Sequence, residues 1–358
     1  MKKKILLVDD SALMRRVLCD IINSDSRFEV ADVANDGVEG FKLLCEKKYD
    51  AVVLDVYMPR MTGLELLKEM QKCNVSANVL VASTTTKEGA RETLLALEYG
   101  ALDFIQKPEH ALDTKSDKFT SRFLMLLDVV ARAGNQSAIR PKKQQAAPAA
   151  EHKAPIAPSS SRIRSRGSKI IAIASSTGGP KALQDVIPRI PTNVNAPIVL
   201  VQHMPKGFTK SLAERLDELS GLPVTEAVDG EQVVAGHVYV APGGQHLKVV
   251  SKGTGHCIQL TDEATREGVK PCANYMYESL AESSYDEIIC AVLTGMGSDG
   301  TVGIKNLKSK KNIYVVAQDE TTCAVYGMPK SIVTSGLADA VAPIDQVANE
   351  IIKNVGVH

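Results

Sequence analysis

The chain has 358 residues, with 42 basic and 42 acidic side chains and 44% hydrophobic residues. This length favours about two domains, and each could bury a core without disulfides. The balanced charge argues against a general nucleic-acid or membrane binder.

Seven cysteines are scattered without a C-x-x-C pair, at positions 19, 45, 73, 257, 272, 290 and 323. This pattern predicts reduced thiols in a cytoplasmic protein. The apolar run that follows the basic start "MKKK" ends at Val8, which is too short for the core of a signal peptide. No apolar run reaches the roughly 18 residues of a transmembrane helix, so we expect no membrane insertion.

The first half of the chain alternates strand-like and helix-like patterns. Five apolar runs are typical of strands: "KILLVDD", "FEVADVA", "AVVLD", "NVLVAS" and "LDFIQKP". Helical periodicity lies between them, for example at Leu13, Val17 and Ile21. The alternation predicts an α/β fold, a doubly wound parallel sheet of (βα)5 type over residues 1–130.

Polar residues end four of these predicted strands, namely Asp9 and Asp10, Asp55, Ser83 and Lys107. Ligands of parallel α/β sheets lie outside the carboxyl ends of the strands, so we expect these residues to meet at one rim. Three clustered carboxylates suit a hard cation such as Mg²⁺, while a lysine and a hydroxyl can bind phosphoryl oxygens. Asp55 could then accept a phosphoryl group. Each residue alone could be a helix cap, but capping does not account for all five.

These residues resemble the receiver domain of response regulators, over residues 3 to about 127. The resemblance implies that a histidine kinase is the phosphodonor, that Asp55 is phosphorylated, and that Asp9, Asp10 and Asp55 hold Mg²⁺. It further implies three residues that bind or sense the phosphoryl group: Ser83, Phe104 and Lys107. The switch hydroxyl could also fall on Thr84, the next residue. Tyr57 stands close to the site without an assigned role.

Residues 134–167 contain four prolines and almost no large apolar side chains. Such a segment cannot bury much surface, so we interpret 131–167 as a flexible linker. Its basic residues could form a nucleic-acid-binding arm, but a solvated spacer is the simpler interpretation. We therefore expect no nucleic-acid partner.

The second half, residues 168–358, begins a new α/β pattern. Four near-continuous apolar runs are typical of parallel strands covered on both faces: "KIIAIASS", "APIVLVQHMP", "EIICAVLTGMG" and "NIYVVAQD". Shorter candidate strands lie between the second and third: "PVTEAV", "HVYVAP", "HLKVV" and "HCIQLT". The turns between them predict an antiparallel insert, followed by a helix at "CANYMYESLAES".

The turn "ASSTGGP", residues 174–180, follows the first of these strands. It lacks the G-x-G-x-x-G spacing of dinucleotide sites and the G-x-x-x-x-G-K-[ST] of P-loops. Pro180 suits the first turn of a helix. The backbone N–H groups there could bind a phosphate, or they could assist a nucleophilic serine. Alternation along a strand points Ser175 and Ser176 in opposite directions, and the pattern does not say which one faces the cleft.

His203 and Asp299 follow two later strands and could meet a serine at the same rim. Nucleophile, base and orienting carboxylate are the three roles of a serine-hydrolase triad. The chain order Ser, His, Asp and the absence of G-x-S-x-G exclude the α/β-hydrolase arrangement. Separately, the serines and Asp299 could cap helices and His203 could be a buried core histidine. Their joint placement at strand ends favours a triad.

The second half resembles the catalytic domain of chemotaxis-type protein-glutamate methylesterases. The motifs that carry the resemblance are "ASSTGGP", "VQHMPKGFT", "DGEQVVAGHVYVAPGGQHL", "LTGMGSDG" and "GMPKSIVTSGLAD". It implies that Ser176 is the nucleophile, His203 the base and Asp299 its partner. The backbone N–H of Met296 would be an oxyanion donor and that of His203 a second candidate. The family's usual Arg-Pro-Ser-Val-Asp is replaced at residues 270–274 by Lys-Pro-Cys-Ala-Asn.

The resemblance implies a phosphorylation-activated serine hydrolase in chemotaxis signalling. It would release methanol from glutamate methyl esters on chemoreceptors and deamidate receptor glutamines, with no metal in the catalytic half. The unphosphorylated receiver would cover the rim of the active site. Two other hypotheses remain at this point: a nucleic-acid-binding response regulator and a nucleotide-dependent oxidoreductase. His237, His246 and His256 show no metal-ligand grouping, although His246 could line the cleft.

Overall fold

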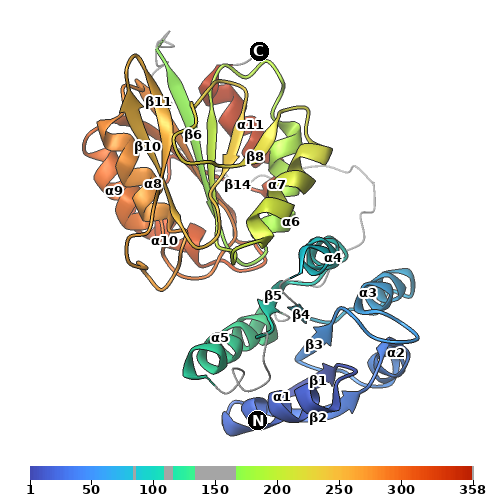
Figure 1. Ribbon diagram of the computed structural model, residues 1–358. Coiled ribbons are helices and arrows are strands. Elements are labelled where there is room, and N and C mark those ends of the chain that lie inside the picture. Colours follow the sequence, from blue (N-terminus) through green and yellow to red (C-terminus); the bar gives the residue numbers. More distant parts are fainter. Residues whose placement is uncertain (84–85, 109–115, 134–166, 357–358) are drawn as a thin grey trace, which may run out of the picture.

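The computed structural model describes residues 1–83, 86–108, 116–133 and 167–356, which form two α/β units (Figure 1). Most of the predicted linker, residues 134–166, lies outside the described residues, as does Thr84. Within the described ranges, no helix combines the length and the apolar character needed to cross a bilayer. All seven cysteines are free thiols, and four of them are buried.

The first unit is a parallel sheet with the strand order β2-β1-β3-β4-β5, which confirms the predicted (βα)5 fold. Its strands are β1 (Lys3–Val8), β2 (Phe28–Ala34), β3 (Ala51–Asp55), β4 (Val79–Ser83) and β5 (Asp103–Gln106). Its helices are α1 (Ala12–Ser24), α2 (Gly37–Glu46), α3 (Gly63–Lys72), α4 (Lys87–Glu98) and α5 (Asp117–Ala133). Alternate strand residues face opposite layers, so Leu7 packs with α1 and α5 whereas Leu6 packs with α2 to α4.

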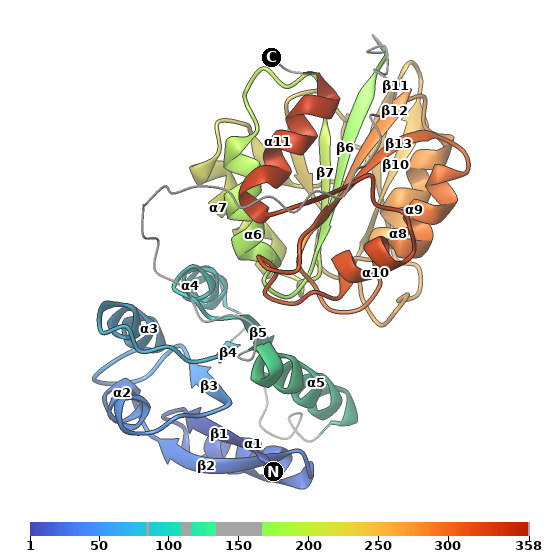
Figure 2. The same cartoon turned by 180° about the vertical axis from the view of Figure 1, so that it is seen from behind.

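The second unit is built on a larger sheet with the order β14-β13-β12-β6-β7-β9-β8. Its strands are β6 (Lys169–Ser175), β7 (Ile198–Gln202), β8 (Val224–Glu226), β9 (Val238–Val240), β12 (Glu287–Val292), β13 (Asn312–Gln318) and β14 (Ala340–Ala342). Helices α6 (Gly179–Val186), α7 (Phe208–Leu219) and α11 (Ile344–Val355) cover one face of this sheet. The short helix η2 (Ile187–Arg189) follows α6 on the same face. Helices α8 (Ala273–Ser279), α9 (Thr301–Lys308) and α10 (Met328–Thr334) cover the other, with η3 (Leu280–Glu282) after α8 (Figure 2).

The predicted antiparallel insert is smaller than the sequence suggested. Among the strands of the described residues, only β10 (His246–Lys252) and β11 (Gly255–Thr261) pair antiparallel, as a separate two-stranded ribbon. The prediction was wrong for the two preceding short strands, because β8 and β9 join the main sheet in parallel pairing. A long connection between β8 and β9 permits this crossover, whereas the turn residues in it had suggested hairpins.

The order of the main sheet places β6 between β12 and β7. The chain leaves β6 toward β7 and later returns to β12 on the other side, so this is a topological switch point of the sheet. Ligands of open α/β sheets bind at the carboxyl ends of strands at such a point. The loops after β6, β7 and β12 therefore define the place where a functional site is expected.

Candidate active site and phosphorylation site

The serine turn follows β6 and leads directly into α6. The N–H of Ser176 donates to the carbonyl of Thr294 at 3.0 Å, and the Ser176 carbonyl accepts the N–H of Gly179 at 2.7 Å. Gly178 has a φ of +76°, and a Cβ there would lie 2.5 Å from the Cβ of Ala324. A glycine is therefore required at this position, both for its left-handed backbone and for the close approach of residue 324.

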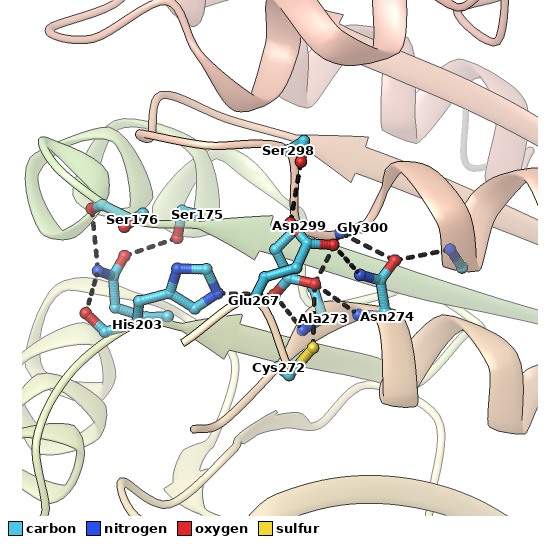
Figure 3. A network of polar contacts seen from close by, with 12 residues as sticks. Ser175, Ser176, His203, Glu267, Cys272, Ala273, Asn274, Ser298, Asp299 and Gly300 are labelled. Atoms are coloured by element: carbon cyan, nitrogen blue, oxygen red, sulfur yellow. Dashed lines mark hydrogen bonds and ion pairs between the residues drawn. The ribbon is translucent and has the colours of Figure 1, made fainter. Parts of the chain in front are cut away.

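The structure distinguishes the two serines of the turn (Figure 3). Ser175 is fully buried, and its hydroxyl donates to the side-chain oxygen of Gln202 at 2.7 Å. The amide of Gln202 in turn donates to the carbonyl of Ser176 at 2.9 Å. Ser175 thus stabilises the turn through a buried hydrogen bond, whereas Ser176 is only partly buried. Sequence reasoning did not identify Gln202, because a polar residue at the end of a buried strand carries no signal of its partner.

His203 lies directly after β7 and pairs with Asp299, which lies in the loop between β12 and α9. The His203 Nε2 to Asp299 Oδ2 distance is 2.8 Å, and the two side chains are 8% and 3% exposed. Figure 3 shows the His203 ring between the two serines and Asp299. The meeting of His203 and Asp299 predicted from the strand ends is therefore present in the structure, and the role of Ser176 as the nucleophile stays a prediction. Because Nε2 faces an acceptor, it carries the proton of the neutral ring, and Nδ1 is the basic nitrogen.

Asp299 accepts hydrogen bonds from several donors besides His203. Those to Oδ1 come from the N–H of Asn274 at 3.0 Å, the N–H of Gly300 at 2.8 Å and the thiol of Cys272 at 3.1 Å. The N–H of Ala273 donates to Oδ2 at 2.6 Å. Burial alone would raise the pKa of Asp299, but these donors and the charge of His203 outweigh it, so the pKa is lowered. The carboxylate is therefore ionised at neutral pH.

Side chains to which the sequence analysis assigned no role support this arrangement. The Thr294 hydroxyl donates to the carbonyl of Thr177 at 2.9 Å and accepts the N–H of Val325 at 3.0 Å, which ties the serine turn to the loop after β13. Asn274 accepts the N–H groups of Gly300 and Gly303, and its amide donates to Glu267 at 2.8 Å. Residues 272–274, part of the departure from the family pattern at 270–274, therefore hold the Asp299 loop.

The oxyanion candidates differ in their backbone surroundings. The N–H of His203 already donates to the carbonyl of Ser175 at 3.1 Å, which argues against its role as a second oxyanion donor. The neighbour of Met296 is held tightly, because the carbonyl of Gly295 accepts the N–H groups of Gly327 and Met328. Met296 lies in the loop that carries Asp299, and its role stays a prediction.

The three other histidines that the sequence analysis considered have structural partners. His246 is fully buried and its Nδ1 accepts the N–H of Cys272 at 3.1 Å. It therefore fixes the backbone of Cys272 and does not line a cleft. His237 contacts the Thr225 hydroxyl at 2.8 Å, and His256 accepts the N–H of Ser284 at 3.1 Å. Burial lowers the pKa of all three imidazoles, which keeps them neutral.

The acidic residues of the first unit form the predicted cluster. Ligand oxygens of Asp9, Asp10 and Asp55 lie within 4.8 Å of one another. The Lys107 ammonium contacts Asp9 at 2.7 Å and Asp55 at 2.8 Å. Burial raises the pKa of Asp55, Lys107 opposes this shift, and the nearby Asp9 adds to it. An all-oxygen donor set with excess negative charge fits a hard divalent cation such as Mg²⁺.

Two predicted switch residues face α4 and the second unit. The Ser83 hydroxyl donates to the carbonyl of Gly89 at 3.2 Å and accepts from the Thr93 hydroxyl at 2.6 Å, both on α4. The ring of Phe104 packs on that of Phe208, at the start of α7, with centroids 4.6 Å apart. These contacts join β4 to α4 and β5 to α7 of the second unit.

Comparisons with known proteins cover both units. Residues 5–115 match the response regulator receiver domain, and residues 171–351 match the family described as CheB methylesterase. The chain belongs to the CheB methylesterase family. This assignment replaces the two alternative hypotheses, a nucleic-acid-binding regulator and an oxidoreductase.

Relatives of similar length share the whole arrangement. A Syntrophomonas wolfei protein named protein-glutamate methylesterase/protein-glutamine glutaminase 1 is 39% identical over 355 residues, covering 98% of this chain and 99% of its own. A Bacillus subtilis protein-glutamate methylesterase/protein-glutamine glutaminase is 38% identical, covering 97% of each chain. The crystal structure of the Thermotoga maritima CheB methylesterase catalytic domain is 45% identical, with a TM-score of 0.51, and covers 52% of this chain and 98% of its own.

In this member of the CheB methylesterase family, the receiver unit contacts the serine turn itself. The Thr177 hydroxyl, next to Ser176, donates to Asp103 of β5 at 2.5 Å. Burial raises the pKa of Asp103, and the Thr177 bond partly offsets this shift. Arg215 of α7 forms a two-pronged ion pair with Glu98 at the end of α4, at 2.7 and 3.0 Å. Figures 1 and 2 both show α4 and β5 on the side of the receiver that faces the catalytic unit.

Proposed function

We propose that this protein is a phosphorylation-activated protein-glutamate methylesterase. It hydrolyses glutamate methyl esters on chemoreceptors, releases methanol, and deamidates receptor glutamines. The observation that carries the proposal is the His203–Asp299 pair beside the Ser176 turn, at the switch point of the sheet. The names of the full-length relatives support the same pair of reactions.

Acylation begins at the serine hydroxyl. Nδ1 of His203 takes the Ser176 proton as Oγ attacks the ester carbonyl carbon. Asp299 stabilises the imidazolium that forms, and its donors keep Oδ2 directed at Nε2. The proton then passes from His203 to the methoxy oxygen, the carbon–oxygen bond breaks, and methanol leaves. For a glutamine substrate the leaving group is ammonia.

Deacylation uses the same base. His203 takes a proton from water, the hydroxide attacks the acyl carbon, and Ser176 regains its proton as the glutamate carboxylate leaves. Both tetrahedral intermediates carry an oxyanion, which the N–H of Met296 and the positive N-terminus of α6 stabilise. No step in this scheme calls on a metal in the catalytic unit.

The receiver unit regulates this chemistry through Asp55, which accepts a phosphoryl group from a histidine kinase. Asp9, Asp10 and Asp55 would hold Mg²⁺, which supplies the positive charge that neutralises the transferred group. Lys107 binds phosphoryl oxygens, and Ser83 exchanges its contact with Thr93 for the phosphoryl group. Because Thr93 lies on α4 and Glu98 ends that helix, this exchange loosens the docking of the receiver on the catalytic unit.

Docking restrains the active site because Asp103 contacts the residue next to the nucleophile. Undocking breaks that contact, the Phe104–Phe208 packing and the Arg215–Glu98 pair. The rim of the active site is then free for a receptor segment. With a histidine kinase as phosphodonor and chemoreceptors as substrate, the protein would act in the cytoplasm.

The nucleophile is tested by comparing two neighbouring serines. Ser176→Ala should abolish methanol release from methylated receptors while the melting temperature stays near that of the parent. Ser175→Ala removes a buried hydrogen bond to Gln202, so it should lower the stability of the protein and leave turnover measurable. Undiminished methanol release by Ser176→Ala would remove the proposal.

A further inference from the structure

Cys272 contacts the catalytic carboxylate although it belongs to none of the three triad roles. Its side chain is fully buried just before α8, and its sulfur lies 3.1 Å from Oδ1 of Asp299. The opposite oxygen, Oδ2, contacts His203 (Figure 3). The thiol therefore holds the far side of the same carboxylate that orients the base.

We propose that Cys272 is a positioning residue of the triad, whose thiol holds Asp299 by Oδ1 so that Oδ2 faces His203. The inference rests on the proposed hydrolase function and adds a residue to its machinery. Cys272 acts through Asp299 and does not touch the substrate.

The thiol is a donor in this contact. Burial, together with the charge of Asp299 and the hydrogen bond to it, raises the pKa of Cys272 to about 12. Cys272 is therefore protonated at neutral pH and can donate to the ionised carboxylate. The backbone N–H of Cys272 is itself fixed on His246, so the thiol approaches Asp299 from a rigid support.

A thiol is a weaker donor than a hydroxyl, and this difference has a consequence for the base. Each strong donor on Asp299 disperses its negative charge and reduces its stabilisation of the imidazolium. A thiol fixes the position of the carboxylate while leaving more of its charge facing His203. A serine at residue 272, the usual family residue, would disperse more of the negative charge of Asp299 than the thiol does.

Other titratable groups near Asp299 remain the same in the proposed variants. They are His203 after β7, Tyr277 on α8, His246 on β10, Arg266, whose charge interacts with Cys272, and Glu267, which reaches the site through Asn274 and Ser298. Changes in pH dependence between variants at residue 272 can therefore be assigned to the donor on Oδ1.

The test compares Cys272→Ala and Cys272→Ser in the full chain, with Cys290→Ala as the matched control. Cys290 is also a fully buried cysteine, on β12, and no contact joins it to Asp299 among the described residues. Two readouts are measured: the acid limb of kcat/KM for methanol release, and the titration midpoint of the His203 ring by NMR with ¹⁵N-labelled histidine.

The two variants should move in opposite directions. Cys272→Ala concentrates charge on Asp299, so both midpoints rise by about 0.5 pH unit, and kcat falls about fivefold because the carboxylate is less fixed. Cys272→Ser disperses charge, so both midpoints fall by a similar amount, and kcat is largely kept. The Cys290→Ala protein should keep the parent midpoints.

Unchanged midpoints in both variants, or shifts in the same direction, would show that Cys272 only fills space and would overturn the proposal. The NMR titration needs no substrate. A parent protein that releases no methanol but shows the opposite shifts would refute the proposed function and leave the Cys272–Asp299 coupling intact.

Discussion

The ion pair between Arg215 and Glu98 should hold the receiver on the catalytic unit, and Glu98→Gln should raise the unphosphorylated activity. Glu98 lies at the end of α4 and accepts two hydrogen bonds from the guanidinium, at 2.7 and 3.0 Å. The Gln variant is nearly isosteric and keeps one acceptor. Arg215 retains Glu218 as an ionic partner at 2.9 Å, so its charge is not left alone.

The size of the effect follows from the geometry and exposure of the pair. The Arg215 and Glu98 side chains are 28% and 19% exposed, which lies between a surface pair and a buried one. A two-pronged pair in such a setting contributes about 1–1.5 kcal/mol after discounting for solvent. Since about 1.4 kcal/mol is a factor of ten, the undocked fraction should rise about five- to tenfold.

The assay is methanol release from methylated receptors without a phosphodonor. Glu98→Gln should show a basal rate about five- to tenfold above the parent, and a correspondingly smaller activation by a phosphodonor. The fully phosphorylated rates of the two proteins should agree, because the catalytic residues are the same. Lys72→Gln is the control, since it removes an exposed ion pair with Glu69 that lies within α3 of the receiver.

An unchanged basal rate in Glu98→Gln would refute this reasoning about docking. An equal rise in the Lys72→Gln control would also refute it, because the effect would then not depend on the interface. A higher phosphorylated rate in Glu98→Gln would place Glu98 in the catalytic step.

Three further predictions concern stability. The pKa of Asp299 is lowered in the folded protein, so the ionised carboxylate stabilises the fold above roughly pH 4. This stabilisation is lost as the pH falls through the folded-state pKa. The free energy of unfolding of Asp299→Asn, measured by urea melts, should therefore depend less on pH in this range than that of the parent. Millimolar Mg²⁺ should raise the melting temperature of the parent, because the cation relieves the repulsion among the clustered carboxylates. Asp10→Asn should reduce this rise. Equal rises in the parent and the variant would contradict the Mg²⁺ site. Gly178→Ala should lower the free energy of unfolding by about 1–2 kcal/mol or more, because residue 178 has a positive φ, and it should also abolish methanol release. A calorimetric scan that shows the variant to be as stable as the parent would contradict the assigned backbone conformation.

The strand ends were the most predictable part of the molecule. Apolar runs that finish in Asp, Ser, His or Lys identify both the strands and the rim, because parallel strands share the direction of their carboxyl ends. This periodicity was enough to bring Asp9, Asp10 and Asp55 together, and to bring His203 beside Asp299.

Features that depend on long-range packing were not predictable from the residues. The pattern does not say which serine faces inward, because the answer depends on Gln202 of a neighbouring strand. The short strands β8 and β9 carry too few residues to show their pairing direction, and the turn residues near them suggested hairpins. Pairing of Asp103 with Thr177 joins two units far apart in sequence, and neither residue carries a local signal.

The departure at residues 270–274 was visible in the sequence, but its meaning was not. In the structure residues 272–274 hold the Asp299 loop through a thiol, two backbone N–H groups and the side-chain oxygen of Asn274, which accepts the N–H of Gly300. A sequence pattern shows that residues differ, whereas the contacts show that they act on the carboxylate of the triad.

The most direct test of the whole account is methanol release from methylated receptors by the full chain, measured with and without a small-molecule phosphodonor and Mg²⁺. The account predicts a low basal rate that rises on addition of the phosphodonor, and no rise in Asp55→Asn. Absence of methanol under both conditions, or a rate that is indifferent to the phosphodonor, would contradict it.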